Sequence, residues 1–135
     1  MEVLYLLDTN ICIYIRQKKP ETVLRHLEKL RPGEAGLSII TYGELIYGAK
    51  KSKHSIAALE RVRELTTVLP PLPLPEAAAE CYGAVRAELE TRGELIGNND
   101  LWIVAHALAA GLTLVTNNEK EFRRVRGLKI QNWIA

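Results

Sequence analysis

The sequence predicts an α/β fold: a single domain with a mainly parallel central sheet of about four to five strands, flanked by helices. Short apolar runs of strand-forming residues alternate with longer segments in which apolar residues recur at helical spacing. Runs such as residues 3–7 are apolar throughout, which is typical of parallel strands buried on both faces. The 135 residues suit one domain, 1–135, with an ordinary hydrophobic core.

The first half of the chain contains two strands, each followed by helices. In chain order, the expected elements are a strand at 3–7, a helix directly after it, a helix from Pro20 to a stop at Pro32-Gly33, a strand at 35–40, and helices at 41–51 and 55–65. Proline at a helix start and Pro-Gly beyond its end are typical boundary signals. The helix at 41–51 opens with Thr41 and Glu44 in the spacing of a capping box.

The second half repeats this alternation after a proline-rich segment. The expected elements are at most a short edge strand within 66–75, a helix at 76–91 that ends at Gly93, a helix at 100–110, a strand at 112–116, a short helix or turn at 117–127, and a strand at 128–133. The prolines of "TTVLPPLPLP" lack backbone donors, which restricts any strand there to the sheet edge. Asn98 or Asn99 is the expected cap of the helix at 100–110, and Gly111 its stop.

Composition narrows the function classes. The net charge is only +2, so any site for a polyanion must come from local clusters of basic residues. Cys12 and Cys81 have neither metal-ligand spacing nor the density of a secreted disulfide scaffold, which favours a reducing compartment. The N-terminal apolar run is too short for a signal peptide, and no window reaches the length of a membrane span. We therefore expect a cytoplasmic protein without a membrane partner.

Three acidic residues stand at element ends that this architecture can bring to one edge of the sheet. Asp8 follows the first strand, Glu44 lies near the start of a helix after the second, and Asp100 opens a later helix. Sites in such folds lie at the carboxyl ends of the strands. Converging carboxylates repel one another unless a cation bridges them, and oxygen ligands suit Mg²⁺ or Mn²⁺ rather than zinc. Metal-dependent phosphodiester hydrolysis is the chemistry that such a site favours.

Each acid also has a purely structural interpretation. Asp8 would cap the helix that follows it, Glu44 would complete the capping box begun at Thr41, and Asp100 would complement a helix dipole. Taken singly, these interpretations compete well with a metal site. The joint pattern of the three acids is what favours the metal site.

Four segments in order carry a resemblance to a known family: "LLDTNICIYI", "SIITYGELIYGAKKS", "IGNNDLWIVAHALAAGLTLVTNNEKEF" and "GLKIQNW". Together they resemble the VapC-type toxins of the PIN-domain ribonuclease family, from residue 4 to residue 133. The resemblance implies a single PIN domain and an endoribonuclease that depends on Mg²⁺ or Mn²⁺. It also implies that Asp8, Glu44 and Asp100 bind the metal.

Many members of that family carry a fourth acid after the strand that here ends at Thr116. This chain has Asn118 where some members have Asp, and Glu121 where others have Asp. An amide can still bind a metal-associated water, and a Glu one helical turn further on can reach the metal through water. The implied catalytic set is therefore Asp8, Glu44, Asp100, Asn118 and Glu121, with the fourth ligand left open between the last two.

The resemblance implies structured RNA as substrate, in particular transfer RNA. Arg123 and Arg124 follow the acidic segment closely and are expected to hold phosphates that flank the scissile bond. Asn10 and Thr116 are expected either to orient waters and ligands or to serve as turn and cap residues. Few aromatic residues and no RNP-like motif predict no platform for stacking many bases.

The resemblance also implies protein partners. Toxins of this family form homodimers and bind a cognate VapB-type antitoxin, whose C-terminal segment lies in a groove and blocks the acidic site. Operator DNA is contacted only through the antitoxin. Besides core packing, this gives a second role to the side chains of Tyr42, Leu45, Ile46 and Tyr47. The remaining notable side chains are interpreted as surface or packing residues (His26, His54, His106) and as core (Trp102, Trp133).

Two other functions fit parts of the pattern. Aspartyl-phosphate chemistry would also use an Asp at a strand end, but the related phosphatases usually have a second Asp where this chain has Asn10. A catalytically silent PIN fold that only binds RNA or protein is suggested by Asn118. The three retained acids and Glu121 argue against it, because clustered carboxylates cost stability that a purely structural protein has no reason to lose.

Overall fold

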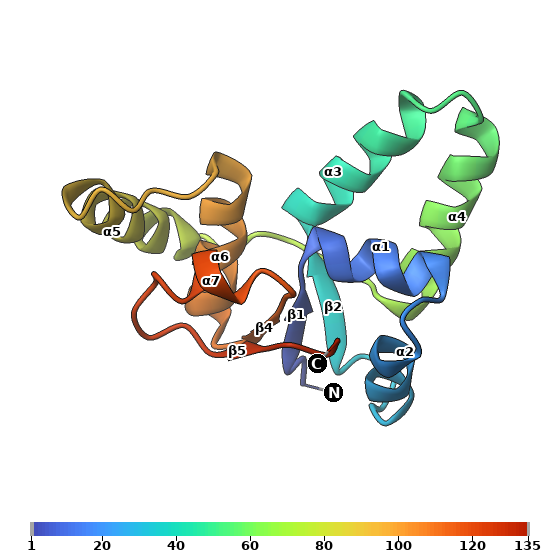
Figure 1. Cartoon of the computed structure of the whole chain (residues 1–135), viewed down its shortest axis with the longest axis horizontal. Coiled ribbons are helices and arrows are strands. Elements are labelled where there is room, and N and C mark those ends of the chain that lie inside the picture. Colours follow the sequence, from blue (N-terminus) through green and yellow to red (C-terminus); the bar gives the residue numbers. More distant parts are fainter. Residues whose placement is uncertain (1, 135) are drawn as a thin grey trace.

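The computed structural model describes residues 2–134 and contains five strands in that range, β1 (Tyr5–Leu7), β2 (Ala35–Ser38), β3 (Pro71–Leu72), β4 (Thr113–Val115) and β5 (Ile130–Gln131). They form one parallel sheet in the order β3-β2-β1-β4-β5 (Figure 1). The helices are α1 (Thr9–Gln17), α2 (Glu21–Glu28), α3 (Ile39–Lys50), α4 (Ser55–Val68), α5 (Ala78–Thr91), α6 (Asn98–Ala110) and α7 (Glu119–Phe122). The expected α/β fold with a mainly parallel sheet is confirmed.

The central strand β1 determines where a site can form. It pairs with β2 on one side, with Tyr5 opposite Ala35, and with β4 on the other, with Leu7 opposite Val115. The chain adds β2 and β3 on one side of β1 and then crosses to add β4 and β5 on the other. The direction of strand addition therefore switches between β1 and β4, and such a switch opens a crevice beyond the carboxyl ends of the strands.

Helices cover both faces of the sheet, and each face has its own core. Leu7, Leu37 and Val115 belong to a buried cluster with residues of α1 to α4, whereas Leu6 and Leu114 pack with residues of α5 and α6. Neighbouring strand residues point to opposite faces, so consecutive leucines of β1 serve both cores. In Figure 1 the α3–α4 pair lies on one side of the central strands β1 and β4 and the α5–α6 pair on the other.

Three of the predicted helix starts needed correction, and the helix expected at 55–65 extends to Val68. The helix expected at 41–51 begins at Ile39, because the hydroxyl oxygen of Ser38 accepts from the Ile40 N–H at 3.2 Å and caps it. The capping box of Thr41 and Glu44 is therefore wrong. The helix expected from 76 begins at Ala78, after a turn at residues 76–77.

The third correction concerns the cap of α6, which is Gly97, so Asn98 and Asn99 lie inside the first turn. The Asn98 carboxamide oxygen instead accepts a hydrogen bond from the Tyr82 hydroxyl. Gly111 ends this helix with φ 68, as expected of a left-handed stop.

The proline-rich segment forms an edge strand, as predicted. β3 has only two residues and pairs with β2 alone. The backbone at Pro70 lies so close to β2 that position 36 requires glycine, because a Cβ on Gly36 would lie 2.9 Å from the Pro70 carbonyl oxygen.

Candidate active site

Asp8 lies directly beyond β1, at the crevice. It is 5% exposed, and both carboxylate oxygens accept hydrogen bonds: Oδ1 from the Ile11 N–H at 2.9 Å and Oδ2 from the Thr116 hydroxyl at 2.5 Å. Oδ1 is thus the cap of α1, so the structural interpretation of Asp8 holds. Each oxygen has a second lone pair, and the side chain also lines a cavity.

Burial is the main influence on the charge of Asp8. It raises the pKa of this carboxyl above its ordinary value, whereas the hydrogen bonds from Thr116 and Ile11 act in the opposite direction. Thr116 itself is fully buried, and its oxygen also accepts from the Asn118 N–H at 2.9 Å. Thr116 therefore orients Asp8 and has no surface with which to meet a substrate.

Glu44 reaches the same cavity from α3. Without a capping box, its side chain is not needed at the helix start, and Oε1 instead accepts from the Thr9 hydroxyl at 2.7 Å. Thr9 follows Asp8 in the chain and also lines the cavity. Sequence reasoning missed this role of Thr9, although its place directly after the strand-ending acid was a usable signal.

Asp100 enters from the other side, in the first turn of α6. Burial raises the pKa of this carboxyl to about 6, and nearby negative charges add to the rise. These charges are the carboxylates of Glu44, Asp8 and Glu121. Acids from three separate elements therefore lie close enough to repel one another.

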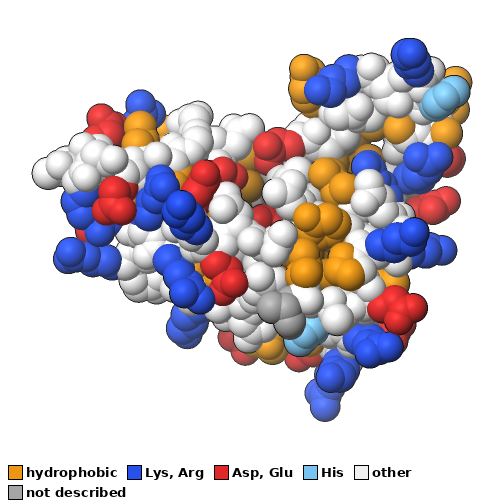
Figure 2. Space-filling view, in the orientation of Figure 1, with side chains coloured by type: hydrophobic (Ala, Val, Ile, Leu, Met, Phe, Trp, Pro, Cys, Tyr) orange, Lys and Arg blue, Asp and Glu red, His pale blue; other side chains and the backbone are white. Residues whose placement is uncertain are grey.

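One cavity of about 140 Å³ brings these acids together, lined by Asp8, Thr9, Asn10, Glu44, Asp100, Asn118 and Phe122. By this measure a single water needs about 10–15 Å³, so there is room for a hydrated ion. The polar lining is made of carboxylates, amides and one hydroxyl, which are the oxygen donors that hard cations prefer. Figure 2 shows acidic side chains in the notch between the two halves of the molecule.

The acidic side chains are not arranged as a set of direct metal ligands. Within residues 2–134, no three His, Cys, Asp or Glu side chains are placed so that they could hold a metal ion directly. The donor set fits Mg²⁺ or Mn²⁺ in its chemistry, because oxygen ligands and mutual repulsion both favour a hard cation. Small shifts of the acidic side chains or bridging waters are needed for several of them to serve one ion.

The two candidates for a fourth ligand are placed differently. Asn118 lines the cavity. Glu121 does not line it, although its charge contributes to the raised pKa of Asp100. Asn10 is exposed at the cavity wall, where it can meet a ligand.

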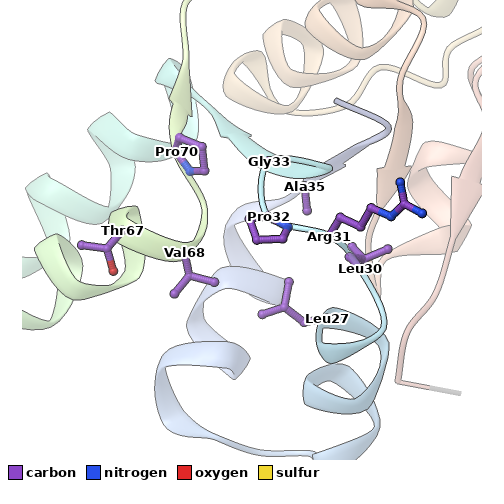
Figure 3. A pocket seen from close by; sticks show the side chains of 9 residues that line it. All are labelled: Leu27, Leu30, Arg31, Pro32, Gly33, Ala35, Thr67, Val68 and Pro70. Carbon is purple, nitrogen blue, oxygen red and sulfur yellow. The ribbon is translucent and has the colours of Figure 1, made fainter. Parts of the chain in front are cut away.

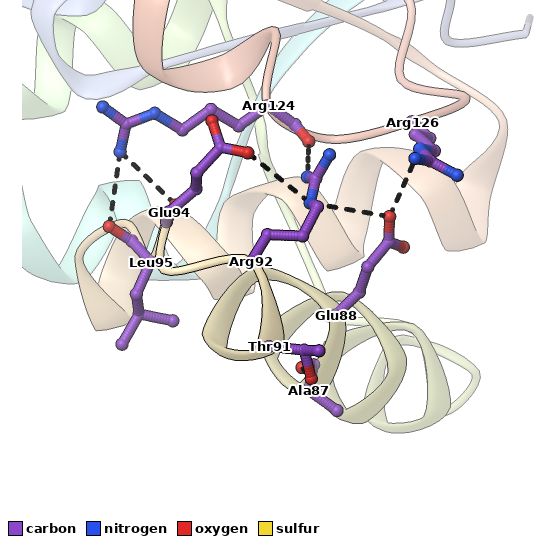
Figure 4. Close-up of polar contacts among 8 residues, drawn as sticks. All are labelled: Ala87, Glu88, Thr91, Arg92, Glu94, Leu95, Arg124 and Arg126. Carbon is purple, nitrogen blue, oxygen red and sulfur yellow. Dashed lines mark hydrogen bonds and ion pairs between the residues drawn. The ribbon is translucent and has the colours of Figure 1, made fainter.

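The two arginines expected to bind phosphates do not line the cavity. Arg123 is exposed and forms an ion pair with Glu119 at 2.9 Å. Arg124 is half-buried, and Nη1 donates to the carbonyl oxygens of Glu94 and Leu95 at 3.4 Å (Figure 4). Its own carbonyl oxygen accepts from the Arg92 guanidinium. Arg124 therefore joins the loop before α6 to the segment after α7.

The aromatic and histidine expectations were mostly confirmed. Trp133 is a core residue at 2% exposure and stacks on His26, with ring centroids 5.3 Å apart. Trp102 is not the core residue that was expected: it is half-buried and stacks on Tyr82, with ring centroids 3.9 Å apart. His54 is exposed. In the part of the chain that the structure describes, no helix is long and apolar enough to cross a membrane.

Comparison with known proteins gives a consistent result. The family model of the PIN domain matches residues 5–128. Ribonuclease VapC2 of Rickettsia felis is 42% identical over 135 residues, which cover 97% of this chain and 98% of that protein. The tRNA(fMet)-specific endonuclease VapC of Shigella flexneri is 40% identical over 129 residues, covering 96% and 97%. The crystal structure of Rickettsia felis VapBC2 bound to a promoter DNA fragment contains a chain that superposes with a TM-score of 0.90 at 40% identity, covering 98% of this chain and 99% of that one.

Proposed function

The chain belongs to the PIN domain family, as one of its VapC-type ribonucleases, and we propose that it cuts RNA at a divalent-metal site made by Asp8, Glu44 and Asp100. It is an RNA-hydrolysing enzyme and the toxin of a type II toxin–antitoxin pair, as its ribonuclease relatives and the VapBC complexes indicate.

The observation that carries the proposal is the cavity at the β1–β4 switch. Its three carboxylates come from the end of β1, from α3 and from the first turn of α6. A strongly anionic cavity would by itself repel a phosphodiester, so RNA chemistry there requires a cation. Asp8 is the fixed member of the set, because both its oxygens are held by hydrogen bonds.

The residues that would hold Mg²⁺ or Mn²⁺ are Asp8, Glu44 and Asp100, with Asn118 or Glu121 completing the site through water. When bound, the ion would supply charge neutralisation and an acidified water for attack on phosphorus. Thr116 keeps Asp8 in place, and Thr9 restrains Glu44. Asn10, exposed at the wall, is suited to orient a water or an RNA oxygen.

The substrate we propose is structured RNA of the transfer RNA class. The Shigella flexneri relative is named for tRNA(fMet), which supports the class and not the particular RNA. Arg16 and Arg61 line a second cavity that shares Glu44 with the acidic one, so positive charge lies beside the acids. Contacts of such residues to phosphates give affinity that depends on salt but little sequence information.

We further propose that a VapB-type antitoxin lies in a groove leading away from the acidic cavity. Four cavities follow one another through shared lining residues: the acidic cavity shares Glu44 with the second, the second shares Arg61 with a third, and the third shares Val68 with a fourth. Figure 3 shows the fourth cavity, which is lined by Leu27 of α2, by residues 30–33 of the loop after α2 and by the end of α4. Its apolar lining suits an amphipathic segment of a partner.

A homodimer face is proposed on α3. Ile39 and Tyr47, two large side chains of this helix, are 42% and 66% exposed and so are available for contact with a second copy of the chain. Leu45 is buried in the core at 4% exposure. The helix therefore has both buried side chains, which pack in the core, and exposed ones, which are available to a partner, as expected. Operator DNA would be reached through the antitoxin.

Cleavage of total cellular RNA by purified protein tests the proposal, with Mg²⁺, Mn²⁺ or EDTA present and the fragment ends mapped. Asp8→Asn and Glu44→Gln remove charge from the cavity, and Glu60→Gln, at an exposed position on α4, is the matched control. We expect metal-dependent cuts by wild type and the control that are absent from both site variants. Undiminished cleavage by folded Asp8→Asn protein would overturn the proposed site. Absence of cleavage with any metal would favour a silent binding module.

A further inference from the structure

A buried polar pair lies between α3 and α6, outside the acidic cavity. His106 Nδ1 lies 2.9 Å from the Ser38 hydroxyl oxygen, and the two residues are 1% and 0% exposed. Around them α6 is apolar, with Val104 and Ala105 fully buried. A polar pair in such surroundings must make its hydrogen bond within the protein, since water does not reach it.

The neighbouring contact leaves the Ser38 hydroxyl able to pair with His106. Its oxygen accepts from the Ile40 N–H at 3.2 Å and keeps one hydrogen and one lone pair, so it can bond to Nδ1 of either tautomer of a neutral ring. Burial lowers the pKa of His106, which favours that neutral ring. The pair is thus a buried hydrogen bond between a hydroxyl and an uncharged imidazole.

This hydrogen bond joins the two helices that carry opposing acids. Ser38 ends β2 and caps α3, the helix of Glu44, whereas His106 lies on α6, the helix of Asp100. The helices are in direct contact, and Ile40 packs against the core that includes Val104. Glu44 and Asp100 line the same cavity, so their repulsion acts to separate α3 from α6.

We propose that Ser38 and His106 are a positioning pair that holds α3 and α6 together against the repulsion between Glu44 and Asp100. The consequence for catalysis rests on the proposed function. Glu44 and Asp100 line one cavity from α3 and from α6, so the separation of these helices sets how closely their carboxylates approach a shared ion. The pair would be a positioning element and not a part of the reacting site.

The test compares two substitutions of His106 that differ in one respect. His106→Asn retains an amide oxygen near the position of Nδ1 that can accept from Ser38, and His106→Leu retains bulk without an acceptor. Leu89→Ala, in the α5 core at 1% exposure, is a control for general loss of stability. If His106→Leu does not fold, Ser38→Ala removes the same hydrogen bond. Ser38→Ala also removes the cap of α3, but that loss is present both with and without Asp100→Asn and therefore cancels in the double-mutant cycle described next.

The first measurement is a double-mutant cycle in thermal stability at pH 8 with EDTA, combining each variant with Asp100→Asn. Removing the charge of Asp100 should raise Tm in wild type, because repulsion is relieved. We expect that gain to shrink in His106→Leu, where the helices can already move apart, and to persist in His106→Asn and Leu89→Ala. An equal gain in all backgrounds would overturn the proposal, because other contacts would then hold the helices.

The second measurement is the affinity for Mg²⁺ alone, by calorimetry. We expect binding to weaken about ten-fold in His106→Leu, as for other groups that orient metal ligands, and to change little in His106→Asn and Leu89→Ala. Unchanged affinity in folded His106→Leu protein would contradict the positioning role. If wild type itself binds no Mg²⁺, the proposed metal site fails, whereas the metal-free cycle still decides the role of the pair.

Discussion

The hydroxyl of Thr116 donates a hydrogen bond to Oδ2 of Asp8 at 2.5 Å and thereby joins the ends of the neighbouring strands β4 and β1. On its other side, Asp8 Oδ1 accepts from the Ile11 N–H at 2.9 Å. The carboxylate is therefore held from a strand and from a helix at once. A fixed acid of this kind is what a metal site needs first, since a ligand that is already oriented loses little freedom on binding.

Replacement of Thr116 by Val should reduce RNA cleavage about 10- to 100-fold, the usual effect of losing a group that orients a metal ligand. The variant keeps the shape of the side chain but removes the hydroxyl. The pKa of Asp8 should rise further, because this hydrogen bond lowers it. Initial cleavage rates over a Mg²⁺ titration measure the effect, with Thr116→Ser as the control that keeps the hydroxyl. Wild-type rates in Thr116→Val would contradict the role.

The charge of Asp100 should make the metal-free protein less stable as pH rises. Its pKa is about 6 in the folded protein against an ordinary 3.8, so the folded state binds the proton more tightly than the unfolded state. The resulting stability is fully present below the ordinary pKa and is lost as pH rises through about 6. Thermal unfolding in EDTA between pH 4 and pH 8 should show this decline in wild type and a smaller one in Asp100→Asn. Equal declines in the two proteins would refute it.

Arg123 and Arg124 should differ when each is changed to Ala. Arg124 holds the carbonyl oxygens of Glu94 and Leu95, so its loss should lower Tm and kcat. Arg123 makes only an exposed ion pair, which adds little to stability because water competes for both charges, so its loss should leave Tm nearly unchanged. If Arg123 meets RNA, KM should rise and the salt dependence of KM should weaken. Unfolding and steady-state kinetics at two salt concentrations separate these outcomes.

Val68→Asp should weaken binding of a VapB-type antitoxin and leave RNA cleavage intact. Val68 is 54% exposed and lines two adjoining cavities of the proposed groove, away from the acids. A carboxylate there would have to lose water when an apolar segment docks. Titration with the antitoxin and the cleavage rate of the free toxin measure the two effects, and Val68→Ile is the apolar control. Unchanged antitoxin affinity would place the partner elsewhere.

Local patterns predicted much of the fold, for reasons visible in single residues. The apolar run around Leu6 and Leu7 formed a buried central strand because each of the two leucines packs on a different face of the sheet. Gly111 ended α6 because glycine adopts a positive φ without strain. The local pattern of Thr41 and Glu44 wrongly predicted a capping box, because Ser38 caps this helix instead by accepting a hydrogen bond from the Ile40 N–H.

By itself, the sequence determined the order of strands and helices and the presence of an acid after β1, within α3 and at the start of α6, because these depend on chemistry between near neighbours. Only the tertiary structure decided how the acids are held and which of Arg123 and Arg124 is exposed. Asp8 and Thr116 stand 108 positions apart, and Ser38 and His106 stand 68 apart. Such pairs meet because β4 crosses to the side of β1 opposite β2, and that arrangement is set by the packing of the whole sheet and not by a local pattern.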